Sequence, residues 1–133
     1  MRNIALFVFA LIFSLNLPAV ADADSDLPAE FIAVSESRMT WVDAKAWCEQ
    51  QGGRLPLVGG SESFDDTPSP GTPLEGFGAT GGPWPVGLPS DSWYWTGTER
   101  SIFPGNSWFV FAHDGYVSYG ASQSGTFRAV CVP

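Results

Sequence analysis

The chain has 133 residues, of which 14% are aromatic and 15% charged, and it carries a formal net charge of −8. This surplus of acidic groups makes nucleic acid and anionic membrane surfaces poor partners, because both carry negative charge themselves. With 15 glycines and 11 prolines, the composition favours an all-β or α+β domain with long ordered loops.

The N-terminus has the pattern of a secretory signal peptide. Arg2 precedes an apolar run over residues 4–17, and the small residues Ala19-Val20-Ala21 follow as a cleavage site. A membrane anchor is the alternative, but about fourteen apolar residues fall short of the roughly twenty that span a bilayer. We expect residues 1–21 to be removed, which leaves 112 residues and a net charge of −9, because Arg2 is the single charge lost. The mature chain is then exported (to the periplasm, the cell surface or the medium), soluble, and not inserted in a membrane.

The mature chain is predicted to hold one domain. Residues 22–30 have the composition of a disordered acidic leader, and residues 31–133 form the domain. Residues 31–35, FIAVS, predict a first strand close to its start.

A capped helix is predicted after Thr40. The Thr40 hydroxyl can accept a bond from the backbone N–H three residues on, and Asp43 stands where a capping box requires an acid. Gly52-Gly53 supplies a left-handed residue that ends the helix. Buried side chains are expected at one-turn spacing along it: Trp41, Ala44 and Cys48.

The middle of the chain is rich in glycine and proline. Residues 54–58 predict a short strand in which Pro56 forbids a central position, and residues 61–64 are compatible with the start of a second short helix. The rest of residues 59–92 is predicted to be a long loop, ordered because it carries several large apolar side chains.

The last third alternates with the period of strands. Strands are predicted over residues 93–96, 108–112, 116–119 and 126–132, and Asp114-Gly115 is a hairpin turn between two of them. We expect these strands to form an antiparallel meander.

The two cysteines, Cys48 and Cys131, both lie in the mature chain. In an exported protein the simplest interpretation of an even pair is a disulfide. A reactive catalytic cysteine is the alternative, but nothing in the sequence places His113, the chain's one histidine, near either thiol.

Four segments together resemble the C-type-lectin-like family: TWVDAKAWCEQQGGRLP (Thr40–Pro56), WPVGLPSDSWYWTGT (Trp84–Thr98), WFVFAHDG (Trp108–Gly115) and GTFRAVCV (Gly125–Val132). The order of these segments and the position of Glu62 are similar to the bacterial domains of intimin/invasin-type adhesins. The resemblance covers nearly all of the mature chain.

This resemblance implies an α+β fold with one or two helices packed on a small antiparallel sheet, long Gly/Pro-rich loops and paired terminal strands. It also implies a disulfide from the first helix to the last strand, between Cys48 and Cys131. The second disulfide of many animal members has no counterpart, because the chain has no further cysteine.

The calcium motifs of sugar-binding members are missing. The stretch equivalent to their last motif, residues 119–126, reads YGASQSGT and holds no carboxylate, while Asp114 and Asp65-Asp66 lie in separate loops. Calcium sites use several oxygens, normally with more than one acid among them. We predict no metal and no cofactor.

No catalytic residue is predicted. His113 beside Asp114 is more typical of an exposed turn than of a general base without a nucleophile. The paired catalytic cysteines of the family's formylglycine-generating branch have no counterpart in the sequence. The chain is therefore not expected to be an enzyme.

The aromatic side chains divide into a predicted core and a predicted ligand-binding set. We assign Trp41, Trp47, Trp93 and Trp95 to the core, since they lie on the helix or on the aromatic strand. In lectin-like folds the ligand side is built from the long loop and neighbouring strands, which gives five candidate positions: Trp84, Phe103, Asn106, Tyr116 and Tyr119.

These observations lead to one expectation and one alternative about function. The expectation is a secreted, adhesin-like bacterial module for cell adhesion or carbohydrate binding, which recognises a glycan or a surface protein without calcium. The alternative is a structural or interaction subunit that docks another exported protein and has no glycan ligand.

Overall fold

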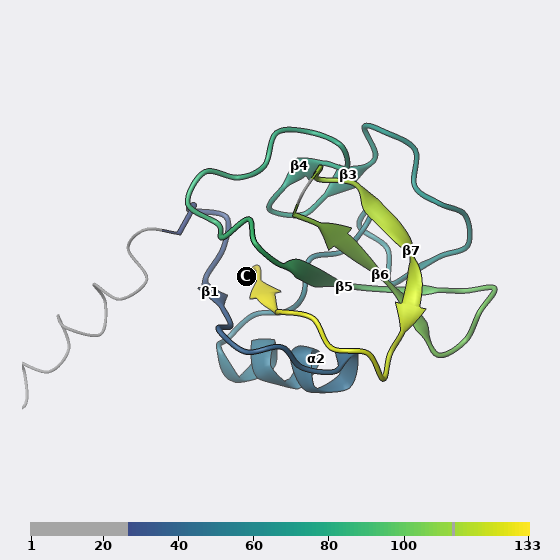
Figure 1. The fold of residues 1–133 in the computed structure, drawn as a ribbon, viewed down its shortest axis with the longest axis horizontal. Helices are drawn as coiled ribbons and strands as arrows, with labels where there is room; N and C mark the ends of the chain where they lie inside the picture. Colours follow the sequence, from purple (N-terminus) through teal and green to yellow (C-terminus); the bar gives the residue numbers. More distant parts are fainter. Residues whose placement is uncertain (1–26, 113) are drawn as a thin grey trace, which may run out of the picture.

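The computed structural model describes residues 27–112 and 114–133 (Figure 1). The predicted signal peptide (residues 1–21), most of the predicted leader (residues 22–30) and His113 lie outside these residues. Leu27, at the leader's end, packs against a core cluster, so the packed part of the chain begins before the predicted start at residue 31. Within the described ranges no helix is both long and apolar enough to cross a membrane.

The predicted helix is confirmed as α2, Trp41–Gln50. The Thr40 hydroxyl accepts from the Asp43 N–H at 3.4 Å, and Trp41, Ala44 and Cys48 are buried. At the other end Gly52 adopts a φ of 89°, and the Gly53 N–H donates to the Cys48 carbonyl at 2.9 Å. This backbone turn, which a glycine adopts at little cost, satisfies the last helical carbonyls.

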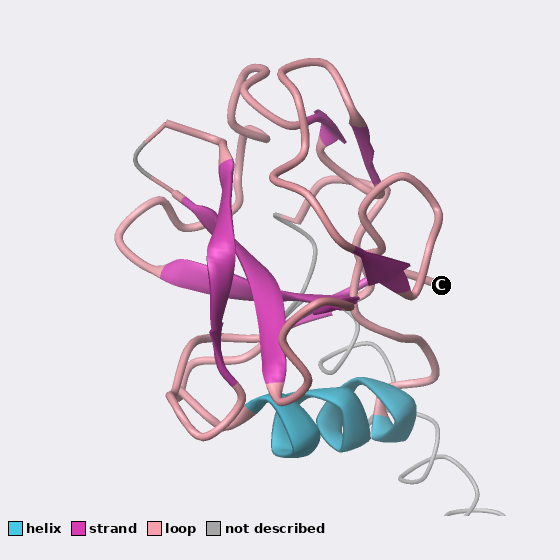
Figure 2. Cartoon of the chain, turned by 90° about the vertical axis from the view of Figure 1, so that its right-hand side faces the viewer, coloured by secondary structure: helices cyan, strands magenta, loops and turns pink. Residues whose placement is uncertain are grey.

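A four-stranded sheet forms the centre of the domain. Its strands are β2 (Ser63–Phe64), β5 (Trp93–Arg100), β6 (Asn106–Phe111) and β7 (Val117–Ser122), in the order β2-β5-β6-β7. β5, β6 and β7 pair antiparallel, as the predicted meander requires, while β2 pairs parallel to β5. Figure 2 shows α2 crossing below one end of this sheet.

The closing segment differs from the single strand predicted over residues 126–132. Only β8 (Val130–Cys131) is a strand, and it pairs antiparallel with β1 (Ala33–Val34) at the start of the domain. Three other residues of the segment make single bridges, each to a separate partner: Met39↔Phe127, Tyr94↔Arg128 and Arg54↔Val132. The segment therefore joins the start of the chain, the helix exit and the edge of β5.

The prediction of a second short helix over residues 61–64 is wrong. The Glu99 N–H donates to the Glu62 carbonyl at 3.0 Å, and the Ser101 N–H donates to the Phe64 carbonyl at 3.2 Å. Because these residues form backbone hydrogen bonds with the edge of β5, the segment is extended and forms β2. Residues 54–58 likewise form bridges at Arg54 and Val58 in place of a regular strand, since Pro56 has no N–H to donate.

The long loop is packed, as predicted. It holds a small hairpin of β3 (Pro73–Leu74) and β4 (Gly78–Ala79), and Phe77 and Leu88 are buried. Gly97 allows the segment that follows the helix to lie close to β5, because an added Cβ would stand 3.2 Å from the Leu55 carbonyl oxygen. The Gly97 N–H donates to the Pro56 carbonyl at 2.8 Å at this approach.

Two hydrophobic clusters fill the α+β domain, and β5 and β6 contribute to both. The loop-side cluster packs the long loop against the sheet and includes Phe77, Leu88, Tyr94, Trp108 and Val110. The helix-side cluster packs α2 against the sheet and includes Trp41, Ala44, Cys48, Trp95, Phe109 and Cys131.

The predicted disulfide lies in the helix-side cluster. Cys48 and Cys131 are bonded, with a Cα–Cα distance of 5.4 Å, and both are fully buried. It joins α2 to β8.

Candidate ligand-binding surface

The five predicted ligand-binding positions do not form one site. Phe103 lies in the turn between β5 and β6, and Asn106 begins β6; the Asn106 N–H donates to the Phe103 carbonyl at 3.1 Å. Tyr116 lies beyond the opposite end of β6, and its carbonyl accepts from the Phe111 N–H at 3.0 Å. The backbone of Tyr119 is in β7, but its side chain lies outside the described residues.

Trp84 packs inside the domain. It is partly buried against the loop-side cluster, with its ring 5.3 Å from that of Phe77 and 5.8 Å from that of Tyr94. Its indole N–H donates to the Leu88 carbonyl at 2.9 Å. The ring and its one donor are thus used within the protein, which gives Trp84 a clear structural role.

Phe103 and Tyr116 remain accessible. Phe103 is 50% exposed, and the Arg100 guanidinium lies 4.4 Å from the centre of its ring. Tyr116 is 42% exposed and covers Gly81, where an added Cβ would meet its ring at 2.8 Å. They mark two separate places on the surface.

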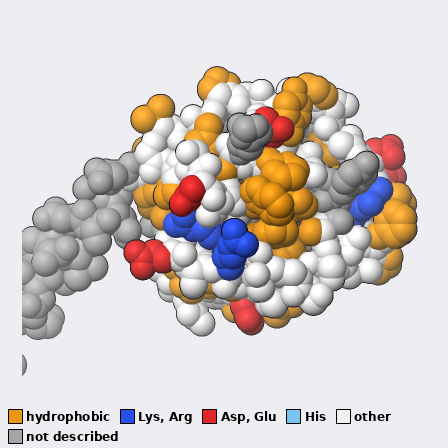
Figure 3. Space-filling model, in the orientation of Figure 1, with side chains coloured by type: hydrophobic (Ala, Val, Ile, Leu, Met, Phe, Trp, Pro, Cys, Tyr) orange, Lys and Arg blue, Asp and Glu red, His pale blue; other side chains and the backbone are white. Residues whose placement is uncertain are grey.

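The structure exposes Trp93, which the sequence analysis assigned to the core, and packs its ring against three phenylalanine rings. We define the aromatic face as Trp93, Phe109, Phe111 and Phe127. Trp93 is 42% exposed, so its assignment to the core is wrong, whereas Trp41 and Trp95 are buried as predicted and Trp47 is partly buried. Figure 3 shows hydrophobic side chains gathered at the middle of this side of the molecule, over the start of β5 and the end of β6.

The rings of the aromatic face contact one another directly. The Trp93 ring centre lies 4.8 Å from Phe111, 5.5 Å from Phe127 and 5.6 Å from Phe109. Phe109 and Phe127 stack at 4.6 Å with an interplanar angle of 22°. Each of these rings therefore has its orientation fixed by its neighbours.

Incomplete coverage by the helix layer explains why Trp93 is exposed. Trp93 pairs with Phe111 and Trp95 with Phe109, so the two pairs lie side by side on one face of the sheet. The segment at the start of the helix covers the second pair: the Trp95 indole donates to the Met39 carbonyl and the Trp41 indole to the Thr96 carbonyl, both at 2.8 Å. Trp93 lies beyond this cover.

Sequence reasoning could have found this face through strand period. Trp93 and Trp95 have the same parity, so both must lie on the helix side of β5. Ten helical residues span about 15 Å, less than the roughly 27 Å of an eight-residue strand. A short helix that crosses the sheet therefore leaves one end of an aromatic strand uncovered.

Polar groups border the aromatic face. Ser118 pairs with Phe109 across β6 and β7 and therefore lies on the same side of the sheet. Arg128, next to Phe127, belongs to the other side of β5: it pairs with Tyr94, and its guanidinium lies 5.6 Å from the centre of the Tyr94 ring. There it forms an ion pair with Asp91 at 3.3 Å and donates from Nε to the Ser35 carbonyl at 2.7 Å. Figure 3 shows basic and acidic side chains beside the hydrophobic patch.

Tyr94, on the opposite side of β5 from Trp93, is a structural residue. Burial raises the pKa of its phenol to about 12, so the hydroxyl stays protonated at neutral pH. It donates to the Pro89 carbonyl at 2.7 Å and thereby holds the end of the long loop on the sheet.

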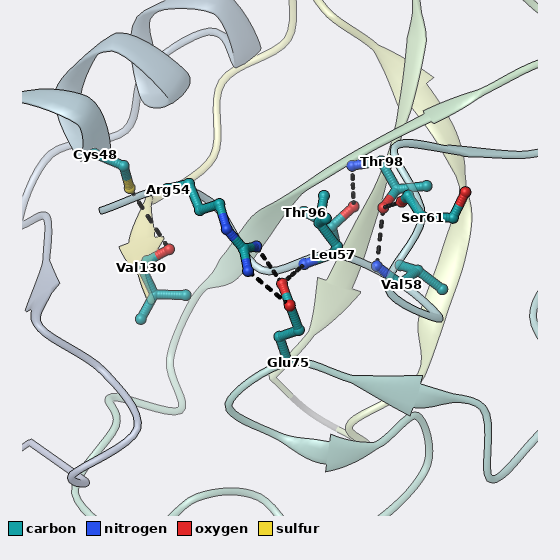
Figure 4. Close-up of polar contacts among 9 residues, drawn as sticks. All are labelled: Cys48, Arg54, Leu57, Val58, Ser61, Glu75, Thr96, Thr98 and Val130. Atoms are coloured by element: carbon teal, nitrogen blue, oxygen red, sulfur yellow. Dashed lines mark hydrogen bonds and ion pairs between the residues drawn. The ribbon is translucent and has the colours of Figure 1, made fainter. Parts of the chain in front are cut away.

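An ion pair between Arg54 and Glu75 holds the long loop against the segment that follows α2. Arg54 and Glu75 form a two-bond ion pair, and Glu75 also accepts from the Leu57 N–H at 2.7 Å (Figure 4). The Arg54 hydrogen bond and the Leu57 N–H lower the pKa of Glu75, against the opposing effect of desolvation. The same hydrogen bond raises the pKa of Arg54.

Thr98 makes a second tie to the loop. Its hydroxyl is buried, accepts from the Val58 N–H at 2.9 Å and donates to the Ser61 carbonyl at 2.7 Å. Figure 4 also draws a contact of 3.7 Å from the Cys48 sulfur to the Val130 carbonyl, which is no hydrogen bond because a disulfide sulfur carries no hydrogen.

A shallow hollow of about 700 Å³ lies between residues 28–30 and residues 73–86. Proline and glycine make up much of its lining, and of its two carboxylates, Glu75 is already held by Arg54. Among the described residues no three His, Cys, Asp or Glu side chains are grouped to hold a metal ion.

The comparisons with known proteins give no assignment: no family model, no curated protein and no solved structure matches the chain.

Proposed function

We propose that this chain is an exported, C-type-lectin-like binding module that recognises a ligand at or beyond the cell surface without calcium, in the manner of an adhesin. The order of elements supports the lectin-like interpretation: a helix beside a small sheet, a long loop before the central strands, and terminal strands β1 and β8 paired. The disulfide between α2 and β8 is a further point of agreement.

The observation that carries a binding role is the aromatic face. Trp93, 42% exposed and packed against three phenylalanines beside the four-stranded sheet, leaves apolar surface in contact with water. The rings are also preorganised, and fixed aromatic side chains are effective anchors for ligands.

Two features support export and independence from calcium. A buried disulfide indicates an oxidising compartment, in agreement with the apolar N-terminal segment. The region equivalent to the calcium site of related lectins, residues 119–126, has no carboxylate.

The alternative is a subunit that docks another exported protein. The turn between β5 and β6 favours it, because Ile102 is 55% exposed and Phe103 50% exposed at neighbouring positions. Such an apolar pair can fill a pocket on a partner protein.

A binding experiment with two matched variants tests the proposal. The oxidised protein is applied to immobilised bacterial and host cell-surface extracts, once with calcium and once with EDTA. We expect binding in both buffers, at least tenfold weaker for Trp93→Ala and unchanged for Phe103→Ala.

A result that depends on Phe103 and not on Trp93, with one exported protein retained stoichiometrically, would favour the docking subunit. Loss of binding in EDTA would contradict independence from calcium.

A further inference from the structure

A smaller hollow, of about 230 Å³, lies beside α2. Its lining comes from α2, from the segment that follows the helix, from Glu62 and from Gly97 in β5, and none of these residues belongs to the aromatic face. We infer that this hollow is a second binding site, for a free basic α-amino acid such as lysine or arginine, which it recognises by charges placed around an apolar floor.

Leu57 and Gly97 form the floor of the hollow. The Leu57 side chain lies against Gly97, where an added Cβ would stand 3.1 Å from its Cδ2. Hydrogen bonds hold both residues in place: the Gly97 N–H donates to the Pro56 carbonyl at 2.8 Å, and the Leu57 N–H donates to Glu75 at 2.7 Å. The floor is therefore formed before a ligand arrives, which limits the entropy lost on binding.

Charged side chains surround this floor: Lys45, Glu49, Arg54 and Glu62. Arg54 is already neutralised, because both of its terminal nitrogens donate to Glu75 (Figure 4). One cation, Lys45, and two carboxylates remain. The complement of that set is a molecule with two positive groups and one carboxylate, which is the charge pattern of a basic amino acid at neutral pH.

The three remaining charges are not paired with one another. Lys45 and Glu49 are four residues apart on α2, a spacing at which opposite charges can pair. The Lys45 ammonium instead lies 4.3 Å from the centre of the Trp41 ring, one turn earlier, and no ion pair among the described residues engages Glu49 or Glu62. All three charged residues are exposed, so a ligand that carries groups of both signs can reach each of them.

The size of the hollow favours a single amino acid over a longer ligand. Pockets for drug-sized ligands have volumes of about 300–1,000 Å³, so a hollow of about 230 Å³ suits a smaller molecule. The methylene stem of lysine or arginine covers apolar surface while its charged end stays in water, which matches an apolar floor with a charged rim. The net charge of −8 also attracts a cationic ligand and repels an acidic one.

The test is a titration of the oxidised, isotope-labelled protein followed by NMR. The Gly97 amide reports on the floor, and the Trp41 indole N–H reports on the position of Lys45. The probes are L-lysine, L-glutamate and cadaverine, which has the two amines of lysine but no carboxylate. We expect saturable shifts with lysine and a dissociation constant on the order of 1 mM, because exposed ion pairs each contribute little. Glutamate should cause no saturable shift.

Substitutions of the exposed charges separate their roles without unfolding the domain. Glu49→Gln and Glu62→Gln should each weaken lysine binding about two- to fivefold. Lys45→Gln should weaken lysine binding by a similar factor but should not weaken cadaverine binding, because cadaverine has no carboxylate for Lys45 to meet. Glu36→Gln and Arg38→Gln, at exposed positions outside the hollow, are the matched controls and should change the affinity by less than about 1.5-fold.

Three results would overturn the inference. The first is the absence of a saturable shift at the Gly97 amide with lysine. The second is equal affinity of the wild-type protein for lysine and cadaverine, which would make the hollow a general acidic surface. The third is a loss of affinity in the control variants as large as that in Glu49→Gln. Trp93→Ala should leave lysine binding unchanged, so this test and the test of the aromatic face can fail independently.

Discussion

Trp93 and Trp95 lie on the same strand and on the same side of the sheet, yet one is 42% exposed and the other fully buried. Each pairs with a phenylalanine of β6 and contacts the ring of Phe127. The difference is the cover supplied by the segment around α2, which reaches Trp95 and stops before Trp93. Strand period determines which side a residue faces, but the crossing layer determines whether that side is buried.

The largest loss of stability is expected from removing the disulfide, which lies in the helix-side cluster with Trp95. Replacing both cysteines with alanine removes a link between residues 83 positions apart. The chain-entropy model gives a loss of about 4–5 kcal/mol in the free energy of unfolding. Urea unfolding of the double variant against the oxidised protein measures it. Two titratable thiols in the unreduced native protein would contradict the disulfide on which this prediction depends.

Truncating the two tryptophans tests the comparison directly. Trp95→Ala opens a cavity and removes one of the two donors to the Met39 carbonyl, which keeps only the Phe127 N–H; the change should cost about 3–5 kcal/mol. Trp93→Ala removes a half-exposed ring and should cost about 1–2 kcal/mol. Equal losses in the free energy of unfolding, measured by heat or urea, would mean that the segment around α2 does not bury Trp95 more than Trp93.

A substitution at Thr98, which hydrogen-bonds to the segment that leads into the long loop, is expected to cause an intermediate loss of stability. Thr98→Val keeps the side-chain volume but leaves the Val58 N–H and the Ser61 carbonyl without their buried partner. We expect a loss of about 2–3 kcal/mol in the free energy of unfolding. Thr126→Val, at an exposed position, is the matched control and should change stability by less than about 0.5 kcal/mol. Similar losses in the free energy of unfolding for both variants would show that the buried Thr98 hydrogen bonds do not stabilise the fold.

The smallest effect is expected at Glu75. Its ion pair with Arg54 is partly exposed, so Glu75→Gln should cost about 1 kcal/mol or less at neutral pH. Because the pKa of Glu75 is lowered in the folded state, this contribution is present above the ordinary glutamate pKa and is lost as pH falls through the folded value. Wild-type and variant stabilities should therefore converge in acid. A difference that grows below the ordinary glutamate range would contradict the assignment.

Features encoded locally were predictable from the sequence. The cap at Thr40, the glycines after α2 and the strands β5, β6 and β7 depend on residues near one another in the chain, and the structure has them. The disulfide was also predictable, because a chain with two cysteines and a predicted signal peptide has only one possible pairing.

Features that depend on distant partners were not predictable. Residues 61–64 have a composition compatible with a helix, and only the free edge of β5, more than thirty residues later, makes them a strand. The exposure of Trp93 depends on where α2 crosses the sheet, and the burial of Trp84 on a contact with Tyr94. These contacts join residues that are far apart in the sequence, and the pattern of a single sequence does not show which distant residues meet.

The pairing of β1 with β8 sets the order in which the domain can mature. Residues at the start of the domain remain without their partner strand until Val130 and Cys131 have emerged, and Cys48 must wait for the same event. Contacts this distant in sequence form slowly, because the intervening chain has to be ordered first. Folding of the domain therefore completes late, when β8 pairs with β1 and Cys131 reaches Cys48.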